Sequence, residues 1–128
     1  MFSNRGCRLL LCFGLLHVAC ATVPLMGPTT TLLPEDPKRT DVTVANAIKA
    51  AALQTGWELE KDGPGQMQAT LRRRSHVAIV TIIYDASGYR IEYKDSTNLD
   101  REGDQIHRSY NKWVRNLDAR IRKQLGYG

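Results

Sequence analysis

Apolar residues recur with helical spacing at the start of the patterned part of this chain, between Asp41 and Gly56. Five small or apolar residues share one side of the predicted helix: Val44, Ile48, Ala51, Ala52 and Thr55. Leu53 falls on the opposite side, so the face that can be buried is narrow and consists mostly of alanine. We expect Asp41 to cap the first amides of the helix and Gly56 to end it in the left-handed conformation.

Alternating apolar and polar residues predict four strands after this helix. The predicted strands cover residues 57–60, 66–73, 76–84 and 89–94. The third of these is the most apolar, so we expect it at the centre of the sheet. On its second face, Val77, Ile79 and Ile83 are expected to be partly exposed, which makes them a candidate contact surface.

A last helix is predicted to begin near Asp104, after a loop at residues 95–103, and it has the clearest amphipathic pattern in the chain. Its apolar stripe contains Ile106, Tyr110, Trp113, Val114, Leu117 and Ile121. The order helix, four strands, helix, with short connections, predicts a single α+β domain over residues 41–128. We expect a four-stranded antiparallel sheet with the N-terminal and C-terminal helices packed on one face.

The start of the chain has the pattern of a bacterial export signal. Arg5 and Arg8 precede an apolar run, Leu9 to Ala19, and small residues close it. The run has 11 residues, about 16 Å as a helix, and a bilayer needs roughly 20 residues. The sequence therefore predicts a signal peptide at residues 1–19 and a protein of the cell envelope or periplasm.

Two processing routes compete at the end of this signal. Residues 16–20, Leu-His-Val-Ala-Cys, resemble the lipobox of bacterial lipoproteins, in which diacylglycerol is linked to the cysteine, here Cys20. Ordinary signal-peptidase cleavage after Ala21 is the alternative, because Ala19-Cys20-Ala21 also fits the small-residue rule. The other two cysteines, Cys7 and Cys12, lie in the signal, and a lone thiol in an oxidising compartment favours lipidation.

Residues 20–40 are predicted to be the lipidated cysteine followed by a tether rich in threonine and proline. Four of the five prolines lie in this segment, which has no helical or alternating pattern. Such a composition is typical of a partly extended linker.

The positive charge of the chain is concentrated in two places. The formal net charge of +5 falls to +3 when the two arginines of the signal are removed. The first cluster is Arg72, Arg73 and Arg74, and the second, on the polar side of the last helix, includes Arg108, Lys112 and Arg115. Export excludes nucleic acid as a partner, so anionic lipid is the available ligand. A solvated surface with no dedicated partner is the alternative.

No catalytic residue or cofactor is predicted, because the sequence shows no nucleophile arrangement and no phosphate-binding loop. No metal site is predicted, because no histidine has a second ligand at suitable spacing. Two groups of polar residues are candidates for contact with a ligand or partner: His107, Tyr110 and Asn111 on the last helix, and Asp95, Ser96 and Asn98 after the last strand. Local hydrogen bonding is the structural alternative for both groups. A small periplasmic enzyme would use His107 with Asp95 or Ser96.

The patterns Y-x-I-x-Y-x-D-S-x-N-L at residues 89–99 and I-H-x-x-Y-N-x-W-x-x-N-L at residues 106–117 resemble small uncharacterised proteobacterial lipoproteins. That resemblance implies an envelope location, with Ala21 after the cysteine pointing to the outer membrane, and it supplies no catalytic residue. The sequence thus predicts a lipid-anchored envelope protein, held by acyl chains such as palmitate on Cys20, whose domain binds or scaffolds another envelope component. The alternatives are a soluble periplasmic binding protein and, third, the enzyme.

Overall fold

The computed structural model of this protein describes residues 22–127, so the predicted signal at residues 1–19, Cys20 and Ala21 lie outside the described residues. The fold is α+β, with two helices and two antiparallel sheets. The helices are α2 (Asp41–Thr55) and α3 (Arg108–Gln124). The strands are β1 (Thr22–Pro24), β2 (Thr29–Leu32), β3 (Glu58–Lys61), β4 (Gln66–Arg73), β5 (His76–Asp85), β6 (Gly88–Thr97) and β7 (Gln105–His107).

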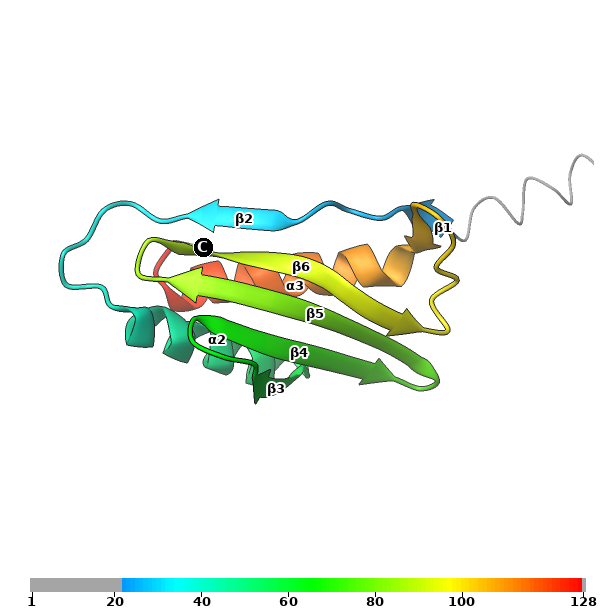
Figure 1. Cartoon of the computed structure of the whole chain (residues 1–128), viewed down its shortest axis with the longest axis horizontal. Helices are drawn as coiled ribbons and strands as arrows, with labels where there is room; N and C mark the ends of the chain where they lie inside the picture. Colours follow the sequence, from blue (N-terminus) through cyan, green and yellow to red (C-terminus); the bar gives the residue numbers. More distant parts are fainter. Residues whose placement is uncertain (1–21, 128) are drawn as a thin grey trace, which may run out of the picture.

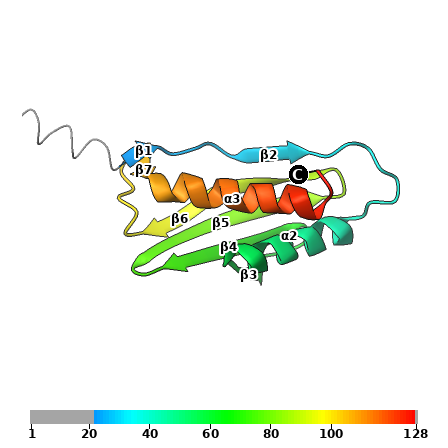
Figure 2. The same ribbon diagram turned by 180° about the vertical axis from the view of Figure 1, so that it is seen from behind.

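Both helices cover the same face of the main sheet (Figures 1 and 2). This sheet has five strands in the order β2-β6-β5-β4-β3, with β5 at its centre as the sequence predicts. The core lies between the sheet and the helices. Its largest fully buried side chains include Tyr110, Ile48, Leu71, Ile82, Ile91, Leu99, Ile106 and Leu117. In α2 the buried side chains other than Val44 and Ile48 are alanines, which lets this helix lie close to its neighbours.

Local signals at the ends of α2 explain where this helix begins and ends. The cap is Thr40 rather than Asp41: the Thr40 hydroxyl accepts a hydrogen bond from the Thr43 amide at 3.2 Å. Asp41 is instead the first helical residue, and its carboxylate accepts the Ala86 amide at 2.8 Å. Gly56 ends the helix in the left-handed conformation, φ 84°, as predicted.

The last helix begins at Arg108 and not near Asp104. Residues 105–107 form β7, where Ile106 pairs with Val23 of β1 in the second, two-stranded sheet. The sequence missed β7 because its partner strand lies in the segment expected to be a tether. The predicted apolar stripe is otherwise confirmed, since Tyr110, Val114, Leu117 and Ile121 are all buried.

The prediction of a tether over residues 20–40 is wrong for the described part of that segment. β1 pairs with β7, and β2 forms the edge of the main sheet by pairing with β6, which makes five strands instead of the four expected. The connection from β2 to α2 is fixed by Arg39, a buried residue whose Nε donates to the Ala86 carbonyl at 2.9 Å. The folded body therefore includes β1 and β2 and does not begin at Asp41.

The close packing of β2 against β6 depends on Gly88. A Cβ atom at this position would lie against the backbone of Thr31 and Leu32, closer to the Thr31 carbonyl oxygen than real atoms approach. We expect Gly88→Ala to displace the edge strand and to lower the free energy of unfolding by about 2 kcal/mol. Gly27→Ala is the matched control, because a Cβ there meets nothing within 4 Å. Denaturant unfolding of both variants measures the difference, and equal stabilities would contradict the packing described.

The outer face of the sheet carries a half-exposed apolar stripe, as the sequence predicts. Ile83 is 42% exposed, and Val77 and Ile79 are half-buried on the same face of β5. Neither helix in the part of the chain described here is long and apolar enough to cross a membrane.

Candidate functional site

One end of the body combines the start of the described chain with several residues singled out from the sequence. We call it the proximal end; it contains β1, β7, the turn between β4 and β5, and the start of α3 (Figure 1). Thr22, the first described residue, pairs directly with His107, the residue that precedes α3. Whatever precedes Thr22 in the protein is thus joined to the body at this end.

Asn111 fixes the N-terminal segment to α3. Its side chain is buried, its Nδ2 donates to the Pro24 carbonyl at 3.0 Å, and its Oδ1 accepts the Met26 amide at 3.2 Å. A single amide thereby satisfies one acceptor and one donor of an irregular segment that has few other partners. Asn111, predicted as a candidate ligand contact, has a structural role.

Removing this amide should loosen the proximal end. We expect Asn111→Ala to lower the free energy of unfolding by about 2 kcal/mol, because both backbone groups lose a buried partner. Limited proteolysis should also cut the chain near Met26 faster, which is a local readout that a general loss of stability does not give. Asn116→Ala is the control, since Asn116 is an exposed asparagine on the same helix. An Asn111 variant as stable and as protease-resistant as the control would contradict this role.

His107 directly precedes α3 and lies beside His76. Its Nδ1 accepts the Ser109 amide at 3.1 Å, so His107 caps the helix. The two imidazole rings are stacked, with centroids 6.1 Å apart and planes 20° from parallel. His76 Nδ1 donates to the Asn98 carbonyl at 2.6 Å. The proximity of the two histidines was not predicted, because β5 and β7 meet only through the tertiary fold. Within residues 22–127, no group of three or more His, Cys, Asp or Glu side chains is placed to hold a metal ion.

The other candidate ligand residues also make contacts within the fold. Tyr110 is a core residue, 1% exposed, and packs edge-to-face on Tyr93 with centroids 5.5 Å apart. Burial raises the pKa of the Tyr110 phenol above its usual range. The Ser96 hydroxyl is 2.8 Å from the Tyr93 hydroxyl, and Asp95 accepts the amide of Ser96 at 2.8 Å.

Asn98 completes this set. It adopts the left-handed conformation, φ 55°, and its Nδ2 donates to the Ser75 carbonyl at 3.0 Å, joining the end of β6 to the β4–β5 turn. Among the described residues, no hydrogen bond joins His107 to Asp95 or Ser96. The six candidate ligand residues therefore stabilise the proximal end and do not converge on one open site.

The structure does bring the two predicted basic clusters together. Arg73, at the end of β4, and Lys112, one helical turn into α3, line the same cavity of about 300 Å³ with Trp57, Trp113 and Asn116. The Arg73 guanidinium lies over Gly56 and donates to the Thr55 carbonyl at 3.3 Å, so it also caps the C-terminus of α2.

No protein-family model, curated protein or solved structure matches this chain. A function for it must therefore be inferred from its own residues and their geometry.

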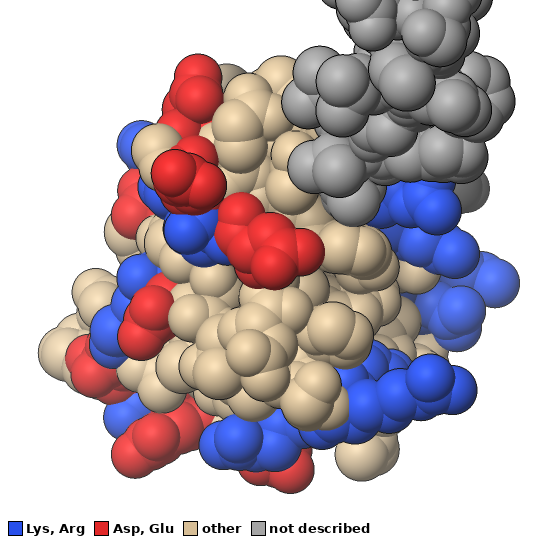
Figure 3. All heavy atoms as spheres, turned by 90° about the vertical axis from the view of Figure 1, so that its right-hand side faces the viewer, with Lys and Arg blue, Asp and Glu red and all other residues tan. Residues whose placement is uncertain are grey.

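The basic residues of the proximal end are not neutralised by neighbouring carboxylates. In the described part of the chain, none of the six predicted anion-contact residues (Arg72, Arg73, Arg74, Arg108, Lys112 and Arg115) forms an ion pair; the ion pairs found involve Arg90, Lys94 and Arg122. Figure 3 looks onto this end and shows one side where Lys and Arg predominate, while most Asp and Glu lie on the other side among further Lys and Arg. The clusters thus form one basic surface rather than two.

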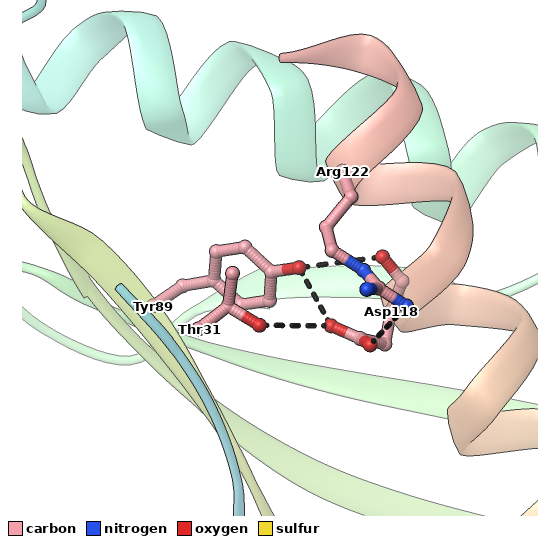
Figure 4. A network of polar contacts seen from close by, with 4 residues as sticks. All are labelled: Thr31, Tyr89, Asp118 and Arg122. Atoms are coloured by element: carbon pink, nitrogen blue, oxygen red, sulfur yellow. Dashed lines mark hydrogen bonds and ion pairs between the residues drawn. The ribbon is translucent and has the colours of Figure 1, made fainter. Parts of the chain in front are cut away.

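A buried polar network on α3 was missed by the sequence reasoning. The Asp118 carboxylate accepts the Tyr89 hydroxyl at 2.6 Å and the Thr31 hydroxyl at 3.3 Å, and Arg122 pairs with its other oxygen at 3.1 Å (Figure 4). Burial, and next the hydrogen bond to Asp118, raise the pKa of the Tyr89 phenol above its usual range. The network joins β2, β6 and α3. Its signal in the sequence was a carboxylate beside Leu117 and Ile121, on the apolar stripe.

Proposed function

We propose that this protein is a bacterial envelope lipoprotein, anchored by acyl chains on Cys20, whose α+β body binds or scaffolds another envelope component and does no catalysis. The observation that carries the proposal is the position of Cys20. It ends the predicted export signal, it is the one cysteine outside the apolar and basic part of that predicted signal, and only Ala21 separates it from β1 in the sequence. We place the protein at the outer membrane, facing the periplasm.

The hydrogen bonds of the candidate site residues support a role in binding over one in catalysis. A general base must reach the proton it removes, and His107 directs its Nδ1 to the cap of α3 while Asp95 and Ser96 bond within their own strand. Two surfaces of the described body have no partner within it. One is formed by the basic residues of the proximal end, which make no ion pairs there, and the other is the half-exposed apolar stripe on the outer face of the sheet.

Extraction of membranes tests the proposed attachment. Envelopes from a Gram-negative host that produces the full chain are washed with high salt and with alkaline carbonate, and then dissolved in detergent. Several acyl chains make detachment negligible, so we expect the protein in the detergent extract alone. Release by salt would show a peripheral protein held by charge, and recovery in the soluble periplasmic fraction would support the alternative cleavage after Ala21.

A further inference from the structure

A single basic surface lies beside the point where the described chain begins. We define the basic face as Arg72 and Arg74 at the β4–β5 turn, with Arg108, Lys112 and Arg115 on the first turns of α3. All five are exposed. Two observations show that the β4–β5 turn and the start of α3 lie side by side. The rings of His76 and His107 are stacked, and Arg73 and Lys112 line the same cavity.

The position of the proposed anchor determines which part of the membrane lies next to the basic face. Thr22 pairs with His107, and Arg108 follows His107 directly. An acylated Cys20 lies two residues before Thr22, and two extended residues span at most about 7 Å. The Asn111 hydrogen bonds prevent this segment from peeling away as a longer linker. An anchor so short holds the proximal end at the depth of the lipid headgroups.

We propose that the basic face docks on anionic phospholipid headgroups of the leaflet that carries the acyl chains, and thereby fixes the orientation of the body. This inference rests on the proposed lipid anchor. Guanidinium and ammonium groups bind phosphate by charge-assisted hydrogen bonds. Trp113, half-buried beside Lys112 in the cavity with Arg73, adds an aromatic group of the kind that favours the membrane interface.

The carboxylates at the proximal end determine which side of the body faces an anionic membrane. Asp100, Glu102 and Asp104 are exposed in the connection from β6 to β7 and outnumber the one basic residue there, Arg101. Figure 3 shows most Asp and Glu of this end away from the side where Lys and Arg predominate. An anionic surface attracts one side and repels the other, so the helical side of this end approaches the headgroups. The outer face of the sheet, with its half-exposed apolar stripe on β5, then stays accessible to the periplasm.

Docking predicts protection of the β4–β5 turn. Because the described body contains no cysteine, a thiol introduced by Ser75→Cys reports on this turn alone. Lys38→Cys lies in the connection from β2 to α2, which Figure 1 shows at the opposite end of the body, and it serves as the control. The mature acylated protein is placed in phosphatidylcholine vesicles with or without phosphatidylglycerol, and a membrane-impermeant maleimide is added. Several basic side chains acting together keep the docked state dominant, so phosphatidylglycerol should slow labelling at Ser75→Cys about tenfold. Labelling at Lys38→Cys should be unchanged, and high salt should remove the protection.

Charge variants identify the residues responsible. In the Ser75→Cys background, Arg74→Asn with Arg108→Gln should abolish most of the protection; asparagine suits the left-handed φ of 56° at position 74. Lys49→Gln with Lys123→Gln removes the same charge elsewhere and should leave the protection intact. Equal labelling with and without phosphatidylglycerol, or protection that survives the Arg74 and Arg108 changes, would overturn the docking. The parent chain separates the two proposals: if its intact mass lacks the added acyl groups, or if the chain begins at Thr22, the anchor itself is absent.

Discussion

Cys20→Ala is expected to abolish incorporation of labelled palmitate and to move the protein from the membrane to the soluble periplasmic fraction. The reason is chemical, because only the Cys20 sulfur can carry the thioether-linked diacylglycerol that a lipobox implies. The other cysteines, Cys7 and Cys12, precede the predicted cleavage site. The effect should be close to all-or-none, since each methylene buried in the bilayer contributes about 0.8 kcal/mol and a full acyl chain has many.

A control distinguishes loss of the anchor from loss of the fold. Cys12→Ala removes a leader cysteine and should leave labelling and fractionation unchanged. The Cys20→Ala protein should also keep the same thermal unfolding transition, because the core of the described body is built from residues after Thr22. Equal labelling of the Cys20→Ala and unaltered proteins would defeat the anchor, whatever the fractionation shows.

The second large effect is expected at Asp118. In Asp118→Ala, the Tyr89 hydroxyl loses its 2.6 Å carboxylate acceptor and the Thr31 hydroxyl loses its bond to the same oxygen. Leaving the buried Tyr89 hydroxyl and the half-buried Thr31 hydroxyl without their charged partner should lower the free energy of unfolding by about 3 kcal/mol. In a domain of this size such a loss corresponds to a fall in Tm of more than about 10 °C. Thermal unfolding followed by circular dichroism measures it.

Two further substitutions test the Asp118 network itself. Asp118→Asn keeps an oxygen acceptor for the Tyr89 hydroxyl, so it should cost about a third as much as Asp118→Ala. Glu35→Ala removes an exposed carboxylate and should change stability little. Loss of the network should also release β2 first, because Thr31 lies on the edge strand. If Asp118→Ala and Glu35→Ala unfold at the same temperature, the network does not stabilise the fold.

Elements with strong local patterns were predicted well from the sequence. The stripe from Tyr110 to Ile121 determines α3, and the alternation in residues 76–84 determines the central strand β5, because each pattern is repeated within one segment. The left-handed end of α2 at Gly56 is likewise a property of one residue.

Edge strands formed through distant pairing were not predicted. Thr29–Leu32 has the β-branched residues that strands favour, but the prolines on either side suggest a linker, and its partner β6 lies far along the chain. β1 and β7, with only three residues each, form through their pairing with one another. A boundary placed at Asp41 therefore excluded the strands that bring the N-terminal segment onto the body.

The candidate site was predicted in its parts but not in its arrangement. The sequence identified both basic clusters, and it identified Asn111 and His107 as candidates for ligand contact or for local hydrogen bonding. It did not show that β4 and α3 place Arg73 and Lys112 around one cavity, or that Asn111 bonds to the backbone of residues 24–26. Both facts depend on contacts between segments far apart in the chain, for which no local periodicity exists.

The intact mass of the mature protein, purified in detergent from a Gram-negative host, tests the lipid anchor most directly. We predict a chain that begins at Cys20 and carries the added mass of a diacylglycerol and a further acyl group. A chain that begins at Thr22 without modification, or one that keeps its leader from Met1, would contradict the lipid anchor and with it the proposed docking of the basic face.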